Sequence, residues 1–253
     1  MANGPRFQEA ADLAKRVPVL KTGCHVVLVD GQAVAPSLPS LTDDAGRFRA
    51  SLKDFAAAAV RKRISAEEIQ RETEAQIRKI QALGIVLTHV DSHKHTHMFP
   101  HVLRPLLRAA RACGVGAVRN PFEPLRSWPG GVIVGTPGLW LRSAGVLTFQ
   151  LFAHQFRKAI VDEGMLTSDG TVGIAVTGKL DQNLLSSILK ALPEGTWELV
   201  CHPGYADADL QAAGTRLVES RQVELEVLKS EETKKAMETL GIELISYADL
   251  KQS

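Results

Sequence analysis

The sequence predicts an α/β fold in which helices cover a largely parallel sheet. Apolar runs of strand length alternate along the chain with segments of helical periodicity. Most of these runs are apolar throughout, which is typical of strands buried on both faces of a parallel sheet. At 253 residues, the chain fits one large domain or two small ones, and a single α/β barrel commonly has this length.

Six apolar runs are the predicted strands: residues 22–29, 85–90, 117–119, 171–176, 197–201 and 243–246. Six other segments are the predicted helices: residues 5–16, 65–83, 100–113, 181–191, 215–228 and 231–240. Two stretches rich in Pro, Gly and Ser, residues 36–49 and 125–137, are predicted to be long loops on the functional rim. Residues 138–163 are a further helix candidate.

Start and stop signals support the bounds of two helices. Ser65 followed by Glu68 is typical of a capping box, and Gly84 is a C-terminal stop signal. Ser230 precedes the acidic first turn of the last helix, and Gly241 ends that helix. The Lys and Glu residues between positions 53 and 79 are expected to form the solvated face of a helix.

Composition and charge exclude several classes of function. The formal net charge is +2, so there is no electrostatic reason to expect nucleic acid or an anionic membrane as the main partner. No apolar run reaches the roughly 18 residues that a membrane span needs, and the first residues lack the hydrophobic core of a signal peptide. Three cysteines cannot all pair within one chain, so we expect free thiols and a cytoplasmic location.

The densest group of candidate functional residues follows the apolar run at residues 85–87. Within ten residues it contains Asp91 and four of the eight histidines, namely His89, His93, His95 and His97. Imidazoles and a carboxylate at the exit of a buried strand are typical of metal ligands or acid–base groups, because neutral imidazole is the commonest metal ligand. The alternative is a solvated polar loop that happens to be rich in histidine.

Two further histidines lie in or next to predicted strands. His25 interrupts an apolar run, and His202 ends another just before Pro203-Gly204 turns the chain. Taken alone, His25 could be a hydrogen-bonded core residue and His202 a turn residue. In a parallel architecture successive strand ends meet over one rim, where ligands bind, so we expect these segments to converge. Arg119 ends a third strand candidate, where it would orient a carboxylate or a substrate oxygen or else form a surface ion pair.

Several stretches of the chain occur together in one known family. They are Gly23-Cys24-His25-Val26-Val27-Leu28 with Asp30-Gly31, the tract from Thr88 to Pro100, Val118-Arg119, Gly173-Ile174-Ala175-Val176-Thr177-Gly178, Cys201-His202-Pro203-Gly204-Tyr205 and Thr215-Arg216-Leu217-Val218-Glu219-Ser220-Arg221. With these motifs the chain resembles the YdjC-like carbohydrate deacetylases of the ChbG and HpnK type, from residue 1 to 253. The Asp-Ser-His-x-His-x-His pattern of the tract is the most specific of them.

The resemblance implies a (β/α) barrel-like fold, shared with other polysaccharide deacetylases, in a single domain over residues 1–253. It implies removal of acetyl groups from N-acetylated sugars such as chitooligosaccharides, with a divalent metal ion, Mg²⁺ or Zn²⁺, as cofactor. In the family an aspartate and two histidines hold the metal, and His25 and His93 match those histidines. The aspartate belongs to an Asp-Asp-Phe-Gly motif of the family's first strand. This motif is absent here, so the resemblance implies a chain that lacks its N-terminal strand.

For such an enzyme the remaining candidates have expected roles. His202 is the expected general acid for the departing amine, and Arg119 is expected to orient the aspartate. Asp91, His95 and His97 are expected to orient a metal-binding histidine or to contact substrate. The expected partner is a small carbohydrate, and a homodimer is a further expectation.

Two aromatic residues and two other functions complete the predictions. Tyr205 and Trp128 offer ring surfaces on which a sugar could stack, with packing as the alternative for each. One alternative function is an amidohydrolase-like or phosphoesterase-like metal hydrolase, because such barrels also carry His-x-His at a strand end. The other is a catalytically impaired sugar-binding protein, which the absence of the tandem aspartates would produce.

Overall fold

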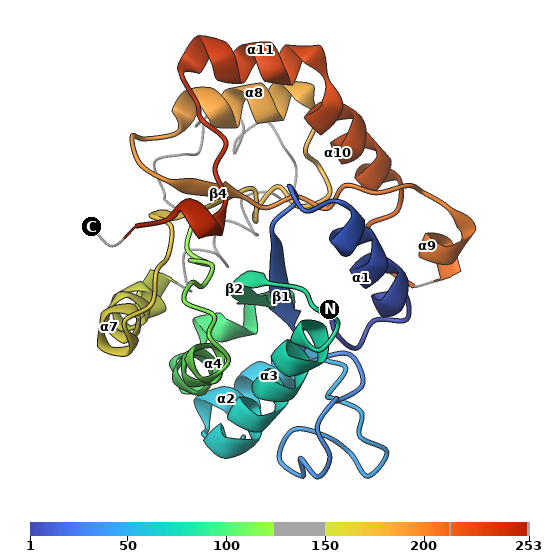
Figure 1. Cartoon of the computed structure of the whole chain (residues 1–253), viewed down its shortest axis with the longest axis vertical. Helices are drawn as coiled ribbons and strands as arrows, with labels where there is room; N and C mark the ends of the chain where they lie inside the picture. The colour runs from blue at the N-terminus through green and yellow to red at the C-terminus, as the bar shows by residue number, and fades with distance from the viewer. Residues whose placement is uncertain (124–149, 213, 252–253) are drawn as a thin grey trace. The chain divides into compact units, whose positions relative to one another are not determined.

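A computed structural model describes residues 1–123, 150–212 and 214–251 of the chain (Figure 1). The chain divides into two compact units, and each is described here by itself. The first unit comprises Met1–Pro121, Leu151–Thr167 and Ser246–Ser253, and the second comprises Phe122–Gln150 and Ser168–Ile245. The predicted loop at 125–137, Trp128 and the first part of the helix candidate at 138–163 lie outside the described residues.

The first unit combines parallel strands with helices that precede the first strand or connect successive strands. Its strands are β1 (Thr22–Val26) and β2 (Leu87–Ser92), and its helices are α1 (Phe7–Arg16), α2 (Leu52–Val60), α3 (Ala66–Gln81), α4 (Pro100–Ala112) and α7 (Ala153–Glu163). The 3₁₀ turn η1 (His93–Met98) follows β2, and η4 (Tyr247–Asp249) lies near the end of the chain. α3 and α4 lie side by side, and α3 also contacts β1 (Figure 1).

The strand pairing of this unit is parallel throughout the described residues. β1 and β2 form a parallel pair. Further parallel bridges join Val90 of β2 to Val118, and Ala117 to Leu166. Four segments of the chain therefore lie side by side in sequence order, which confirms the prediction of an α/β fold with parallel strands.

The core of the first unit lies between these strands and the amphipathic helices. Inward-facing residues of α3 and α4 are buried and apolar, among them Ile69, Ile77, Leu103 and Leu106. Burying one such side chain fully contributes about 1.5–3 kcal/mol. Pro100 begins α4 at a position where the helix makes no use of a backbone N–H. The helices are thus fixed against the strands, and with them the strand ends that carry the histidines.

Three buried polar side chains on α3 hold the loop that follows β1. They are Glu68, Glu72 and Gln76, spaced four residues apart on one face of the helix. The Val27 N–H donates to Oε1 of Gln76 (2.9 Å), and Nε2 of Gln76 donates to the Val27 carbonyl (2.7 Å). Because this amide occupies the backbone groups that a neighbouring strand would use, β1 ends at Val26 and not at residue 29 as predicted.

The two glutamates of α3 bind the same loop further along. Glu72 accepts hydrogen bonds from the backbone N–H groups of Val34 (3.0 Å) and Ala35 (2.8 Å). Glu68 accepts from the N–H (2.9 Å) and the hydroxyl (2.8 Å) of Ser40. The expectation of a solvated face is wrong for these two residues, because backbone donors offset the cost of burying their carboxylates. The loop predicted at 36–49 is therefore held against α3 by hydrogen bonds to a buried carboxylate of that helix.

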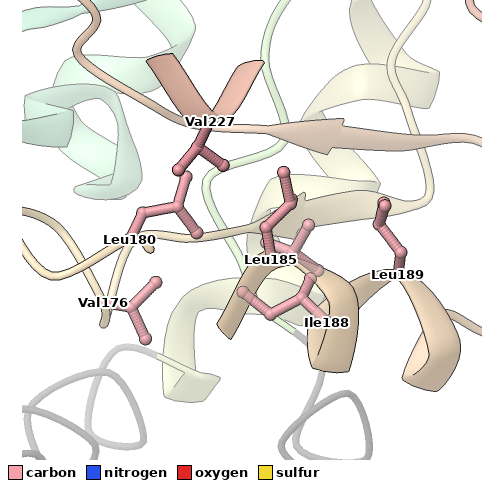
Figure 2. Close-up of a cluster of buried hydrophobic side chains, with 7 residues drawn as sticks. Val176, Leu180, Leu185, Ile188, Leu189 and Val227 are labelled. Atoms are coloured by element: carbon pink, nitrogen blue, oxygen red, sulfur yellow. The ribbon is translucent and has the colours of Figure 1, made fainter. Parts of the chain in front are cut away.

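The second unit has its own parallel strand pair and its own core. Its elements are β3 (Gly170–Val172), α8 (Gln182–Ala191), β4 (Trp197–Leu199), α9 (Ala208–Ala212), α10 (Glu219–Lys229) and α11 (Glu231–Leu240). β3 and β4 are parallel, and α8 packs beside α11 (Figure 1). Figure 2 shows the apolar side chains that gather between these elements: Val176, Leu180, Leu185, Ile188, Leu189 and Val227.

The strand bounds depart from the predicted ones at several places. β2 continues through Asp91 to Ser92, so Asp91 lies in the strand and not past its end. β3 and β4 are shorter than the runs predicted from their apolar residues. The strand predicted at 243–246 is wrong, since these described residues form no strand and Leu244 is 78% exposed. An apolar run forms a strand only where another strand pairs with it.

The helix signals are confirmed with one exception. Ser230 caps α11 by accepting from Thr233 N–H, and Gly241 ends it with φ +66°. The hydroxyl of Ser65 accepts from Glu68 N–H (3.3 Å), but the Glu68 carboxylate binds Ser40, so the capping box is only half formed. α2 and α9 are additional to the predicted helices. None of the described helices combines the length and the apolar character needed to cross a membrane.

Candidate active site

Three neighbouring segments of the first unit bring polar side chains together at one place. The register of β1 and β2 sets His25 beside Asp91. His25 Nδ1 lies 2.7 Å from Oδ2 of Asp91. Nη1 of Arg119, which follows the bridge between Val90 and Val118, donates to the same carboxylate oxygen. Residues that are 66 and 28 positions apart in sequence thus share one carboxylate.

The Asp91 carboxylate is buried and ionised. Burial alone would raise the pKa of this carboxyl, but His25 and Arg119 together hold the pKa well below its usual range. An ionised Asp91 is an acceptor only, so Nδ1 of His25 carries the proton in their hydrogen bond. This fixes the ring of His25 and leaves Nε2 as its metal-binding atom, as in the carboxylate–histidine–metal arrangement of many metal sites.

His93, the first residue of η1, lies against His25. The two ring centroids are 5.6 Å apart, and the rings meet edge to face at 75°. Because bonds from zinc to histidine nitrogen are about 2.0–2.1 Å, two imidazoles that share an ion have centroids about 5–6 Å apart. Burial, and after it the charge of His25, lowers the pKa of His93 to about 4, so its ring is neutral at pH 7. The pair therefore fits a divalent ion that prefers nitrogen ligands.

The described residues contain no cluster of three metal-ligating side chains. Among residues 1–123, 150–212 and 214–251, no group of three His, Cys, Asp or Glu side chains is arranged to hold a metal ion. His25 and Arg119 both bind Oδ2 of Asp91. The fit to a metal thus rests on the two imidazoles, with Asp91 orienting one of them.

His97, the fifth residue of η1, is fully buried and makes hydrogen bonds through both ring nitrogens. Nε2 lies 3.2 Å from the Arg119 carbonyl, and Nδ1 lies 2.6 Å from the hydroxyl of Ser92. Since a carbonyl only accepts, Nε2 carries the proton and Nδ1 accepts from Ser92. The Ser92 hydroxyl also accepts from Thr96 (3.0 Å). His97 therefore connects the turn to the backbone of Arg119, and both its ring nitrogens are occupied within the protein.

Three residues around the site adopt left-handed backbone conformations without being glycine. They are Asp30 (φ +59°), Lys94 (φ +53°) and His95 (φ +53°). Nζ of Lys94 donates to Oδ2 of Asp30 (2.8 Å) and so joins the loop after β1 to the turn after β2. Nδ1 of His95 is buried and has no hydrogen-bond partner in the described part of the chain. Such strain and unmet polar atoms are common at functional sites.

His89 lies in β2, two residues before Asp91. Its Cα partner is Gly23, where a Cβ would overlap the His89 ring. The ring stacks on Tyr247 of η4, with centroids 4.1 Å apart and planes at 20°. Glycine at position 23 thus makes room for a histidine that packs against the C-terminal segment.

His202 and Tyr205 belong to the second unit, so their approach to the histidines of the first stays a prediction. The His202 N–H donates to the buried carboxylate of Glu224 on α10. Arg221 of the same helix donates to the His202 carbonyl (3.5 Å), and its own carbonyl accepts from Gly204 N–H (3.2 Å). α10 therefore fixes the backbone of the His-Pro-Gly turn, while Tyr205 is 71% exposed.

The supporting residues Gln76, Ser92 and Glu224 are absent from the sequence predictions. The one available signal is the presence of polar residues at helix positions that the apolar periodicity assigns to the core, as for Gln76 and Glu224. Ser92 has no such signal, because it stands among polar residues in the tract.

Known proteins with similar sequences agree on one family. A family model described as YdjC-like protein matches residues 1–239. A carbohydrate deacetylase of Brevibacillus brevis is 32% identical over 250 residues, which cover 99% of this chain and 86% of that protein. A chitooligosaccharide deacetylase of Yersinia enterocolitica is 29% identical over 252 residues, which cover 98% of this chain and 85% of that one.

A solved structure shows the same similarity in three dimensions. It is a protein of Enterococcus faecalis V583 described as a cellobiose-phosphate cleavage protein. The TM-score is 0.69 at 25% sequence identity, over 98% of this chain and 84% of that one. Sequence and structure comparisons thus give the same result, and the chain belongs to the family of YdjC-like proteins.

Proposed function

We propose that this protein is a metal-dependent hydrolase that removes acetyl groups from N-acetylated sugars. The names of its relatives, carbohydrate deacetylase and chitooligosaccharide deacetylase, support the reaction and the substrate class. The single structural observation that carries the proposal is the His25–His93 pair, two adjacent imidazoles of which one is oriented by Asp91.

We propose a (β/α) barrel-like fold as the framework of this site. The parallel order of β1, β2 and the bridged segments at Val118 and Leu166 supports it. A single domain over residues 1–253 stays a prediction. In such a framework His202 would stand on the same rim as the histidines of the first unit.

His25 and His93 would hold the metal through one ring nitrogen each. Two imidazole ligands favour zinc or another transition metal over magnesium, which prefers oxygen ligands. When bound, the ion would polarise the acetyl carbonyl and lower the pKa of a water molecule.

The protein's own residues prepare and complete the hydrolysis. Arg119 keeps Asp91 ionised, and Asp91 keeps the proton of His25 on Nδ1. In the reaction, the hydroxyl of a water molecule adds to the acetyl carbon, the C–N bond breaks, and acetate and a free amine leave. The proton that the water loses is balanced by the proton that the amine nitrogen takes up, and His202 is the proposed donor to that nitrogen. A small carbohydrate is the proposed partner, and a homodimer stays a prediction.

One other function is favoured by an observation. The lack of a third ligand among the described residues is what a sugar-binding protein without catalysis would show. An amidohydrolase-like or phosphoesterase-like reaction has less support, because the similar curated proteins are deacetylases.

The cysteines Cys24, Cys113 and Cys201 are all free, which supports the proposed reducing, cytoplasmic setting.

Acetate release from N-acetylglucosamine oligomers, with and without added zinc, tests the proposal. We expect release by the native chain, stimulation by zinc, and loss of at least about a hundredfold in His25→Ala and His93→Ala. His154→Ala is the matched control, because His154 lies exposed on α7. Sugar binding without acetate release under all metal conditions would favour the binding protein instead.

A further inference from the structure

The turn after β2 maintains a conformation that opposes the local preferences of its residues. Lys94 and His95 both have φ +53°, and neither is a glycine. A left-handed conformation costs a residue of this kind about 1–3 kcal/mol and persists only where its surroundings impose it. Here Ser92 and His97 fix the end of the turn, and the Lys94–Asp30 ion pair fixes its beginning.

His95 adds a second unfavourable feature at the same position. Its Nδ1 atom is buried and finds no hydrogen-bond partner among the described residues. A buried polar atom left in this state costs about 1–3 kcal/mol. Its nearest charged surroundings are those of the candidate site, since His97, Arg119, Asp91 and His25 all act on the ring electrostatically.

His97 shows what an ordinary supporting histidine looks like in this turn. It stands two residues later, its ring centroid lies 6.3 Å from that of His95, and both its nitrogens have partners. The two histidines therefore differ in role although the sequence does not distinguish them. His97 makes hydrogen bonds through both ring nitrogens, whereas Nδ1 of His95 is buried with no partner among the described residues.

We propose that Nδ1 of His95 holds the acetamido group of the substrate by a hydrogen bond. The inference rests on the proposed deacetylase function and names a residue that recognises the group to be removed. An acetamide offers an acyl oxygen and an N–H, and a neutral imidazole nitrogen pairs with either, according to its tautomer. His95 lies in the same turn as His93, and its ring centroid is 6.3 Å from that of His97, so an acetyl group held near this turn would come within reach of its ring if His25 and His93 bind the metal.

Two substitutions at position 95 separate binding from folding. His95→Gly relieves the left-handed strain and removes the nitrogen, so it should fold at least as well as the native chain. Its kcat/KM for N,N′-diacetylchitobiose should fall at least about tenfold, which is the worth of one good hydrogen bond. His95→Asn also tolerates φ above zero, and its amide reaches the place of Nδ1, so it should stay within about threefold of the native value.

His154→Asn is the matched control. It makes the same change at an exposed histidine of α7 and leaves the turn after β2 unaltered. Its kcat/KM should stay close to that of the native chain. Thermal unfolding of all three variants shows that each is folded.

Nitrogen NMR of the histidine rings gives a readout that does not depend on turnover. Adding N,N′-diacetylchitobiose to the native chain should move the Nδ1 resonance of His95 and leave that of His97 in place. Native kcat/KM in His95→Gly, or an unmoved Nδ1 resonance while the sugar binds, would overturn the inference. A shift caused by zinc alone would also overturn it, by making His95 a metal ligand. A native chain that neither binds nor deacetylates any N-acetylated sugar would overturn the proposed function as well.

Discussion

Replacing Arg119 with methionine is the most informative perturbation of the candidate site. Arg119 and Asp91 form an ion pair in which the side chains are only 15% and 6% exposed. The substitution keeps most of the volume but leaves a buried carboxylate without its cation. Removing one partner of a buried pair costs about 3–5 kcal/mol, because the remaining charge cannot regain its hydration. We therefore expect the free energy of unfolding to fall by about that amount at pH 7.

Arg104→Met provides a matched control for this effect. Arg104 also pairs with an aspartate, Asp162, at 2.6 Å, but the two side chains are 38% and 34% exposed. A solvent-exposed pair is worth about 0–1 kcal/mol. Urea unfolding followed by far-UV circular dichroism measures both variants, and native-like m-values show that they unfold from similar states.

A double-mutant cycle isolates the pair from the other contacts of Arg119. Asp91→Asn removes the charge that Arg119 neutralises, so the double variant should lose less than the sum of the two single losses. Equal, small losses in Arg119→Met and Arg104→Met would refute the reasoning. It would mean that the Asp91 carboxylate is either hydrated or neutral in the folded protein.

Three further predictions concern residues outside the metal site. In Gln76→Leu, both backbone groups of Val27 lose their hydrogen-bond partner, so the free energy of unfolding should fall by about 2–4 kcal/mol. Amide hydrogen exchange at Val27 should also accelerate, and unchanged exchange would contradict the role of Gln76. Glu123 is buried against the N–H groups of Gly173 (2.8 Å) and Ala175 (3.1 Å), and burial raises its pKa from 4.5 to about 7. A raised carboxyl pKa contributes stability that is complete below pH 4.5 and is lost as the pH rises through 7. Between pH 5 and pH 8, the free energy of unfolding of the native chain should therefore fall by about 2–3 kcal/mol relative to that of Glu123→Gln. Parallel pH profiles of the two proteins would contradict this. Glu224→Leu frees the backbone of His202 and should lower deacetylation while zinc affinity stays native; a parallel loss of zinc would place His202 at the metal.

The sequence predicts the parallel strands and the meeting of His25 with the histidine tract, because both follow from the apolar pattern and from chain order. The approach of Arg119 to Asp91 is of the same kind, since consecutive parallel strands place their ends together. The parallel strands and the meeting of residues at their ends depend on the order of the elements along the chain. The pattern of apolar and polar residues in the sequence is enough to predict that order.

The features that the sequence does not predict depend on which backbone group a side chain reaches. Glu72 and Gln76 have the residue types of a solvated helix face, yet they bind the loop after β1. His95 and His97 are both histidines and stand two residues apart, but the backbone is left-handed at Lys94 and His95. The ring of His97 makes hydrogen bonds that the ring of His95 does not make. Local backbone geometry of this kind is invisible to periodicity, and the failed strand at 243–246 has the same origin, because pairing is a property of the neighbours.

The sharing of one divalent ion by His25 and His93 can be measured directly by X-ray absorption at the zinc edge of the zinc-loaded protein. The structure predicts that both imidazoles bind the ion in the native chain, that one fewer is counted in His93→Ala, and that His154→Ala is unchanged. An imidazole count that is the same in the native chain and in His93→Ala would contradict the account.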